Sequence, residues 1–266
     1  MKIGVFDSGL GGLSILKSIR QKLPEYDYVF LGDTLHVPYG SRSPETISSL
    51  TQQCVHSLFD QDCALVIVAC NTACAHALRD IQHNHLPEGK RVLGVVVPTL
   101  EAAHALNLSS IGLLATSGTI QSGIYREELE KIHPDISIID QAAPLLVPLM
   151  EHDGWDFIEP ALKKYLSHFQ ATRTEGVILG CTHYGQLENT VRAMMPQGTH
   201  ILSQNKIVPA SLADYLSRHD WLETQLSRNG TAELYVTELT DHFADNAKRF
   251  FSPDASFRRL RVKSSA

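Results

Sequence analysis

The sequence has no excess of positive charge and no long apolar run. Its 266 residues carry 23 Lys and Arg against 29 Asp and Glu, a net charge of −6. Surfaces that bind nucleic acid are basic, so we expect no nucleic-acid partner. No apolar run reaches the ~18 residues of a membrane span, so we expect no membrane partner. Residues 1–7 read as a strand without a charged n-region or an apolar h-region, which predicts that no secretory signal is present.

Cysteine is scarce, and basic residues gather at one place only. Five cysteines, an odd count without signs of secretion, predict reduced thiols and a cytoplasmic protein rather than disulfides. Four basic residues lie near the end of the chain, where we expect a solvated edge strand or tail: Arg258, Arg259, Arg261 and Lys263. No low-complexity linker divides the chain.

Short apolar runs alternate with helical patterns from the first residue. Strands are predicted at 3–6, 28–31, 65–69 and 92–97, and helices at 10–23, 46–59 and 73–81. This order is typical of an α/β fold, in which helices flank a mostly parallel sheet. Sites in such sheets lie at the carboxyl ends of strands. Four residues are predicted to lie there: Asp7, Asp33, Cys70 and Pro98.

The pattern then restarts. Residues 111–118 (IGLLATSG) resemble residues 3–9 (IGVFDSG), an offset of 111 − 3 = 108. Later strands are predicted at 136–140, 177–179, 200–202 and 232–236. Because domains commonly run to roughly 100–200 residues, we predict two pseudo-symmetric α/β lobes with the active site between them. Residues 1–97 plus 208–266 would form the first lobe and residues 98–207 the second.

Two of the predicted strands end at a cysteine. Cys70 and Cys181 are 181 − 70 = 111 residues apart, and each is followed by residues that can form hydrogen bonds. Two facing thiols suit a reaction that works on both faces of one carbon. A helix N-terminus after each strand would lower the pKa of the thiol, and His183 or Asp7 could relay the proton. Alternatively, each thiol is only a buried side chain, or both join Cys74 and His183 around zinc.

The loop after the first strand, 7–12 (DSGLGG), is rich in glycine. It could bind a nucleotide, with Asp33 about 20 residues further on. The carboxylate of Asp7 would repel a pyrophosphate, however, and suits an ammonium group or proton transfer better. Asp7 and Ser8 could also simply cap the helix. Tyr39 and Gly40 lie in a turn that could bind a carboxylate through backbone N–H groups, and Glu151 is a weaker candidate.

Five motifs together resemble bacterial glutamate racemases over nearly the whole chain. They are 7–12 (DSGLGG), Asp33 with 38–40 (PYG), 69–73 (ACNTA), 115–119 (ATSGT) and 180–183 (GCTH). The resemblance implies a cofactor-independent isomerase that interconverts L- and D-glutamate for peptidoglycan synthesis, with two lobes and a homodimeric assembly. It implies that Cys70 and Cys181 are the acid/base thiols, assisted by Asp7 and His183. It further implies a set of substrate-binding residues: Ser8, Tyr39, Gly40, Asn71, Thr72, Thr116, Thr119, Glu151 and Thr182.

The chain departs from this family at two positions. Gly185 stands where the family often has proline, which would loosen the turn behind His183, and Cys74 stands where serine or threonine is usual. We expect Cys54, Cys63 and Cys74 to be structural and no metal to be bound. Three other functions remain open: a racemase for aspartate or another acid, a non-enzymatic solute-binding protein, and a hydrolase that needs only one of the two thiols.

Overall fold

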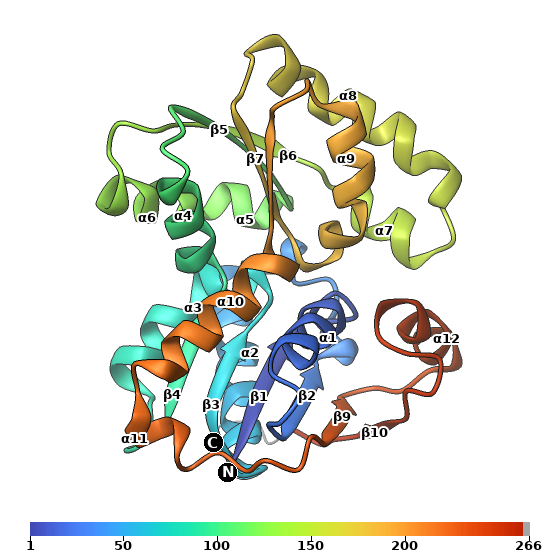
Figure 1. Ribbon diagram of the computed structural model, residues 1–266. Helices are drawn as coiled ribbons and strands as arrows, with labels where there is room; N and C mark the ends of the chain where they lie inside the picture. The colour runs from blue at the N-terminus through green and yellow to red at the C-terminus, as the bar shows by residue number, and fades with distance from the viewer. Residues whose placement is uncertain (263–266) are drawn as a thin grey trace.

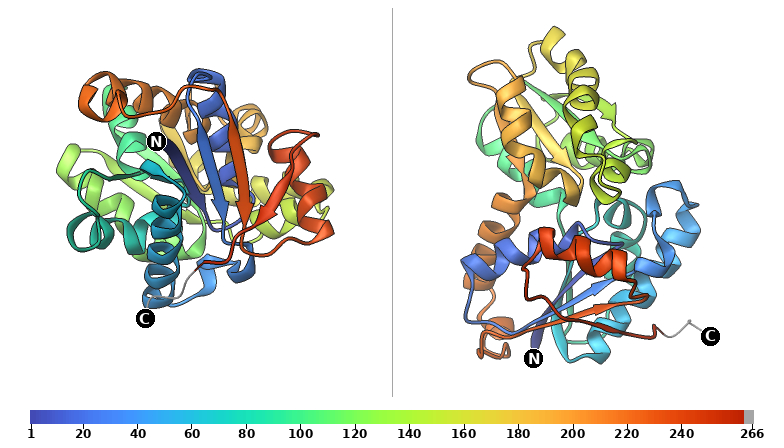
Figure 2. Two further views of the ribbon diagram at one scale, coloured as in Figure 1. Left: turned by 90° about the horizontal axis from the view of Figure 1, so that it is seen from below. Right: turned by 90° about the vertical axis from the view of Figure 1, so that its right-hand side faces the viewer.

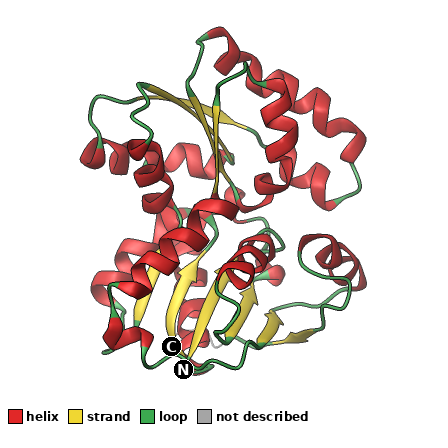
Figure 3. Cartoon of the chain, in the orientation of Figure 1, coloured by secondary structure: helices red, strands yellow, loops and turns green. Residues whose placement is uncertain are grey.

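The backbone forms two lobes, one above the other, each built on a parallel β-sheet with helices on both faces (Figures 1 and 3). The computed structural model describes residues 1–262, so Lys263 of the basic cluster lies outside the described residues. Every strand pair in both sheets is parallel. The predicted α/β architecture with two parallel sheets is confirmed.

The first sheet has the strand order β10-β9-β2-β1-β3-β4. Its strands are β1 (Lys2–Asp7), β2 (Tyr28–Gly32), β3 (Cys63–Val68), β4 (Arg91–Gly94), β9 (Ala232–Val236) and β10 (Phe257–Arg259). All six residues of β3 are buried, as expected for a central strand that helices cover on both faces. β10 lies at the edge of the sheet with Arg258 and Arg259 exposed, as predicted for the basic cluster.

The second sheet repeats the core of the first. Its order is β6-β5-β7-β8, from β5 (Ser110–Ala115), β6 (Ser137–Ala142), β7 (Gly176–Gly180) and β8 (His200–Ser203). This order matches β2-β1-β3-β4, so β5 corresponds to β1 and β7 to β3. Cys70 and Cys181 therefore come after equivalent strands in the two sheets.

Helices cover both sheets (Figures 1 and 3). Around the first sheet lie α1 (Gly12–Lys22), α2 (Pro44–Asp60), α3 (Asn71–Asn84), α10 (Gln204–Ser217), α11 (Asp220–Glu223) and α12 (Asp241–Phe250). Around the second lie α4 (Val96–Ala105), α5 (Ser117–Ser122), α6 (Ile124–Ile132), α7 (Leu146–Glu151), α8 (Ile158–Ala171) and α9 (Glu188–Met194). Four 3₁₀ turns are η1 (Thr34–His36), η2 (Tyr39–Ser41), η3 (Trp155–Phe157) and η4 (Thr182–Leu187). Within residues 1–262, no helix combines the length and apolar character needed to cross a bilayer.

Local sequence explains where these helices begin and end. In α2, Ser43 is the N-cap and accepts a hydrogen bond from the backbone of Thr46, and Pro44 occupies the first helical position, where its missing N–H is not needed. In α1, the predicted apolar stripe is buried from Leu13 to Ile19. The helix ends at Lys22, two residues before Pro24, as the sequence predicts.

The strand predicted at 92–97 is wrong in its second half. β4 ends at Gly94, and α4 begins at Val96. Pro98 therefore lies in the first turn of a helix rather than at the end of a strand. The valine run reads as a strand by composition, but a proline in the first turn of a helix loses no hydrogen bond there.

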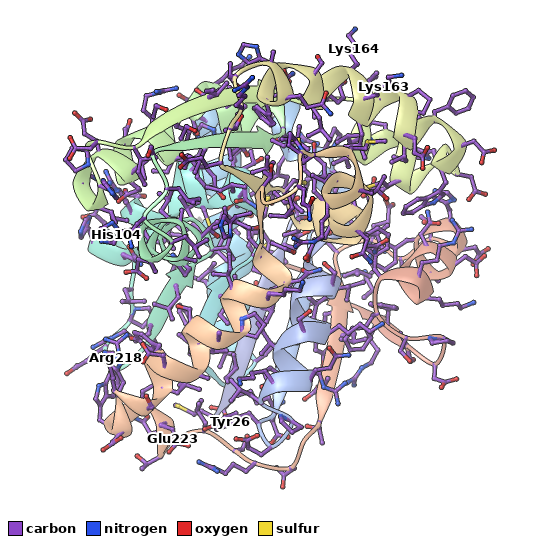
Figure 4. The ribbon with its side chains drawn as sticks, turned by 45° about the horizontal axis from the view of Figure 1, so that its top comes forward. Tyr26, His104, Lys163, Lys164, Arg218 and Glu223 are labelled. Carbon is purple, nitrogen blue, oxygen red and sulfur yellow. The ribbon has the colours of Figure 1, made fainter. Side chains whose placement is uncertain are left out.

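The chain passes between the two sheets twice. It leaves the first sheet through α4 and returns through α10, which packs against α1. The C-terminal strands β9 and β10 then extend the first sheet. The right-hand view of Figure 2 shows the two lobes from the side. Tyr26 and Glu223, hydrogen bonded at 2.6 Å, mark the far end of the first lobe, and Lys163 and Lys164 on α8 mark the opposite end (Figure 4).

Candidate active site

A cavity of about 510 Å³ lies where the carboxyl ends of the two sheets face each other. Parallel sheets place ligands at this edge because the loops after the strands meet there. All of the predicted site residues except Asp7 line it: Ser8, Tyr39, Gly40, Cys70, Asn71, Thr72, Thr116, Thr119, Glu151, Cys181, Thr182 and His183. Residues from both lobes thus form one cavity, and Asp7 lies directly behind it.

Cys70 is the N-cap residue of α3 and is 7% exposed. Its sulfur lies 3.4 Å from the hydroxyl of Ser8. Burial and the nearby charge of Asp7 raise the pKa of Cys70 to about 12, although the backbone of Ala73 and the hydroxyl of Ser8 oppose this shift. The predicted lowering by the helix N-terminus is present, through the backbone of Ala73, but loss of solvation outweighs it and the net shift is upward. Cys70 is a neutral thiol at neutral pH.

Asp7 ends β1 and is almost completely buried. One carboxylate oxygen accepts the backbone N–H of Gly9 at 2.9 Å, and the other accepts the hydroxyl of Thr182 at 3.3 Å. Burial raises the pKa of Asp7, against the opposing effect of His183 and these hydrogen bonds. Because Thr182 comes after β7, Asp7 links the two lobes behind the cavity.

Cys181 belongs to a chain of three polar groups in the second lobe. Its sulfur lies 3.8 Å from Nδ1 of His183, and Nε2 of His183 lies 2.7 Å from Oε1 of Glu151. Burial alone would lower the pKa of His183, but its hydrogen bonds to Cys181 and Glu151 raise it well above its usual value. Burial alone would raise the pKa of Glu151, but His183 lowers it. The ring of His183 therefore lies between a carboxylate and a sulfur, which favours its imidazolium form.

The C-terminal helix α12 contacts two members of this group, Glu151 and His183. The sequence did not predict these contacts. Asn246 and His242 both contact the backbone carbonyl of Glu151, at 2.7 and 3.0 Å. The ring of Phe250 packs edge-on against His183, with the centroids 5.4 Å apart. α12 lies beside α7 across the gap between the lobes (Figure 1). Residues after 240 thus help to hold Glu151 and His183 in place.

Three threonine hydroxyls form a cluster on the other side of the cavity. Thr72 lies 3.2 Å from both Thr116 and Thr119, which are 3.0 Å apart. Thr72 is on α3, and the other two are at the start of α5, where Thr116 is the N-cap. Hydroxyls can donate or accept, so this cluster can bind the oxygens of a carboxylate.

Tyr39 and Gly40 lie in the turn η2 and line the cavity. The hydroxyl of Tyr39 donates to Asp33 at 2.7 Å, and Asp33 also accepts from Thr237 at 2.8 Å. Burial raises the pKa of Tyr39, which remains a neutral donor. Asp33 is therefore used to anchor this turn and is not free to hold a ribose, as the nucleotide-binding alternative would require.

Asn71 lines the cavity, but its side-chain amide is paired with protein groups. It forms two reciprocal hydrogen bonds with Gln204, both of 2.9 Å, and its oxygen also accepts from Tyr125 at 2.7 Å. Gln204 and Tyr125 were not predicted. The rule that found the cysteines could have found Gln204, because it lies directly after the strand β8.

The remaining cysteines are buried away from the cavity lining. Cys74 donates to the carbonyl of Val68 at 3.0 Å, and burial raises the pKa of its thiol to about 12. Within the described part of the chain, no three His, Cys, Asp or Glu side chains form a group that could hold a metal ion. A Cβ at Gly185 would come within 2.7 Å of Cγ of Asn205, so glycine is needed there for space.

Comparison with known proteins agrees with this geometry. The family model described as Asp/Glu/Hydantoin racemase matches residues 3–208. A glutamate racemase from Ruegeria sp. (strain TM1040) is 34% identical over 270 residues, covering 97% of this chain and 99% of the relative.

The chain belongs to the Asp/Glu/hydantoin racemase family. This racemase is an amino-acid isomerase, as its sequence motifs indicate. It superimposes on a glutamate racemase isoform from Bacillus anthracis with a TM-score of 0.90 at 29% identity, covering 98% of each chain. A glutamate racemase from Francisella tularensis, solved in complex with D-glutamate, gives 0.89 at 29% identity, covering 99% of this racemase and 98% of that chain.

Proposed function

We propose that this racemase interconverts L- and D-glutamate by a two-thiol mechanism that needs no cofactor. The observation that carries the proposal is the placement of Cys70 and Cys181. They come after equivalent strands in two facing lobes, and both line the same cavity. A planar carbanion held between them would have one sulfur on each face.

We infer the starting protonation state of each thiol from the groups around it. Cys70 starts as the neutral acid, because its pKa is raised to about 12. Cys181 starts as the base, because the imidazolium of His183 lies beside its sulfur. In one direction, the thiolate of Cys181 takes the α-proton, and the electron pair of the broken C–H bond stays on the α-carbon. The thiol of Cys70 then gives its proton to the opposite face, and the two thiols end with exchanged protonation states.

The α-hydrogen of an amino acid is very weakly acidic, so the cavity must stabilise the carbanion. Preorganised donors do this best in a site that excludes water. We propose that hydroxyls of Thr72, Thr116, Thr119 and Thr182 hold the carboxylates. Ser8, Tyr39, Gly40 and the backbone of Asn71 would complete the binding site. The buried carboxyl of Asp7 lies where it can assist proton transfer beside Cys70, as His183 with Glu151 can beside Cys181.

The substrate and the cellular role are inferred from relatives. The Ruegeria and Francisella proteins are named glutamate racemases, and the latter binds D-glutamate. We propose the same substrate here, a role in supplying D-glutamate for peptidoglycan, a cytoplasmic location and a homodimeric assembly.

The first test is α-proton exchange with single-thiol variants. Cys70→Ser and Cys181→Ser are incubated with each glutamate enantiomer in D₂O, and deuterium at Cα and optical rotation are measured over time. Wild type should racemise glutamate, and each variant should lose racemisation by about 10³-fold or more, as expected on removal of a group that transfers the proton. Cys63→Ser, a buried cysteine outside the cavity lining, is the matched control and should racemise at the wild-type rate.

Other outcomes would contradict parts of the proposal. If the wild type acts on aspartate but not on glutamate, the substrate assignment is wrong. If only one of the two thiols is needed, the two-thiol mechanism is wrong and a single nucleophile is favoured. If neither amino acid exchanges and the protein holds zinc, the cysteines are ligands and the proposed reaction is rejected.

A further inference from the structure

Four buried polar side chains meet at the junction of the two lobes, and we call them the hinge cluster: Asn71, Thr99, Tyr125 and Gln204. None is more than 3% exposed. They come from four helices, α3, α4, α6 and α10. α4 and α10 are the two segments through which the chain passes between the sheets (Figure 1). The hinge cluster therefore joins both crossing segments to the helix that begins directly after Cys70.

The hydrogen bonds of the hinge cluster centre on Gln204. Its oxygen accepts from Nδ2 of Asn71 at 2.9 Å, and its Nε2 donates to Oδ1 of Asn71 at 2.9 Å. Nε2 also faces the hydroxyl of Tyr125 at 3.0 Å and that of Thr99 at 3.4 Å. Tyr125 in turn donates to Oδ1 of Asn71 at 2.7 Å, and Thr99 donates to the carbonyl of Val95 at 2.6 Å.

Each hydroxyl proton in the hinge cluster has an acceptor. The hydroxyl protons of Tyr125 and Thr99 are used on Asn71 and Val95, so both oxygens can accept. The two protons of the Gln204 amide face three acceptors, of which Thr99 is the most distant at 3.4 Å. Turning the amide of Gln204 over would place its NH₂ group against that of Asn71. The orientations of the two amides are therefore coupled, because neither can turn over alone without losing hydrogen bonds in a buried network.

We propose that the hinge cluster is a lock between the lobes that fixes the position of Cys70, and that Gln204 and Tyr125 are positioning residues for the reaction. Asn71 lies directly after Cys70, and its side chain is tied to Gln204 from the second crossing segment and to Tyr125 from the second lobe. Cys181 lies in that second lobe. The hinge cluster thus sets where one thiol sits relative to the other, while neither amide needs to touch the substrate through its side chain.

This lock should act on the chemical step more than on binding. Its link to the reaction rests on the two-thiol function proposed above. Tyr125→Phe removes one hydroxyl and leaves the amide pair in place, so the variant should fold. A displacement of about 1 Å at a reacting group can lower a rate by about 100-fold. We expect kcat for glutamate to fall about tenfold to 100-fold while KM changes by less than about twofold.

Tyr28→Phe is the matched control. Tyr28 is equally buried, and its hydroxyl donates to the carbonyl of Leu23 at 2.6 Å, far from the cavity. The control loses a comparable hydrogen bond and should keep the wild-type kcat. Two rates should also respond differently in Tyr125→Phe. Racemisation needs both thiols, whereas deuterium exchange into the enantiomer whose proton Cys181 removes needs only Cys181. Because Cys181 is not held by the hinge cluster, racemisation should fall more than this exchange. A general loss of folded protein would lower both rates equally.

A second arm needs no activity. Gln204→Met keeps the length of the side chain and removes its amide, so local opening at the junction should increase. Iodoacetamide labelling, read peptide by peptide, should alkylate Cys70 about threefold faster or more than in wild type, with Cys63 unchanged as the internal reference. This experiment tests the hinge cluster even if wild type fails to racemise glutamate. That failure would reject only the proposed function.

Two results would each overturn the inference. One is a kcat in Tyr125→Phe no lower than that of Tyr28→Phe. The other is a rate of Cys70 alkylation in Gln204→Met equal to that of wild type.

Discussion

At the scale of single residues, the two cavity thiols have unlike surroundings. Cys70 faces the hydroxyl of Ser8 and the buried charge of Asp7, whereas Cys181 faces the ring of His183. The first environment favours a neutral thiol, and the second places an ionisable ring beside the sulfur. Glu151 takes part in this difference, because its hydrogen bond, with that of Cys181, raises the pKa of His183.

We predict that Glu151→Gln weakens the enzyme most at high pH. The variant keeps the shape of the side chain and removes its charge, so the pKa of His183 should fall. The alkaline limb of kcat/KM should then move to lower pH, with about tenfold lower activity or more above neutral pH. Profiles of kcat/KM against pH for both proteins check this. An unchanged alkaline limb would show that Glu151 does not control the protonation of His183.

The same change should alter stability in a window of pH. The pKa of His183 is raised on folding, so its contribution is present below its unfolded value near 6.5 and is lost as pH rises through the folded value. The pKa of Glu151 is lowered, so its contribution is present above 4.5 and is lost on acidification. Between pH 4.5 and the folded pKa of His183, urea denaturation should show the variant about 2 kcal/mol less stable than wild type. Below and above this window, the difference in stability should be smaller. Glu223→Gln, which removes a carboxylate at the far end of the first lobe (Figure 4), is the control and should leave activity unchanged.

At the scale of elements, the N-terminus of α1 approaches η4 very closely. A Cβ added at Gly11 would lie 2.6 Å from Nδ1 of His183 and would overlap the hydroxyl of Thr182. The backbone of Gly11 has ordinary helical angles, φ −59° and ψ −37°, so glycine is needed here for space and not for conformation. This contact brings the first lobe directly against the histidine beside Cys181.

We predict that Gly11→Ala lowers kcat about tenfold to 100-fold, because the methyl group must push His183 away from Cys181. Steady-state kinetics with glutamate measure this. The control is Gly89→Ala, where φ is +74° but a Cβ would meet nothing within 4 Å. That variant should be slightly less stable and fully active. Equal activity of the two variants would mean that η4 can shift without cost.

Strand ends were the informative signal in the sequence. They located Cys70 and Cys181 because a buried apolar run followed by polar residues is visible locally. The same rule failed at Pro98, where the run of valines continues into α4. Glu151 was only a weak candidate before the family resemblance, since its partner His183 is 32 residues away.

Contacts between distant elements could not be predicted. Asn246 reaches Glu151 across 95 residues, and Gln204 reaches Asn71 across 133. Such pairs depend on how α12 and α10 pack, and no local pattern encodes that packing. The parallel sheets and the burial of their central strands, by contrast, can be derived from alternating strands and helices.

At the scale of the whole molecule, the second sheet repeats the order of four strands of the first, but the segments after the equivalent strands differ. Cys70 begins the 14-residue helix α3, whereas Cys181 begins the 3₁₀ turn η4 before α9. The helix α12 contacts Glu151 and His183, on the side with Cys181. A duplicated framework thus carries two half-sites with different surroundings.

This inequality has a consequence for the direction of turnover. Mirror-image molecules have equal free energies in water, so the equilibrium mixture holds equal amounts of both, and kcat/KM must be the same from either side. Between the two enantiomers, kcat and KM can therefore differ only by the same factor. Because the thiols are unequal, we predict a factor on the order of several-fold. Progress curves started from each pure enantiomer measure this factor, and identical constants would mean that the half-sites are kinetically equivalent. The asymmetry can bias which enantiomer occupies the enzyme, but not which one accumulates.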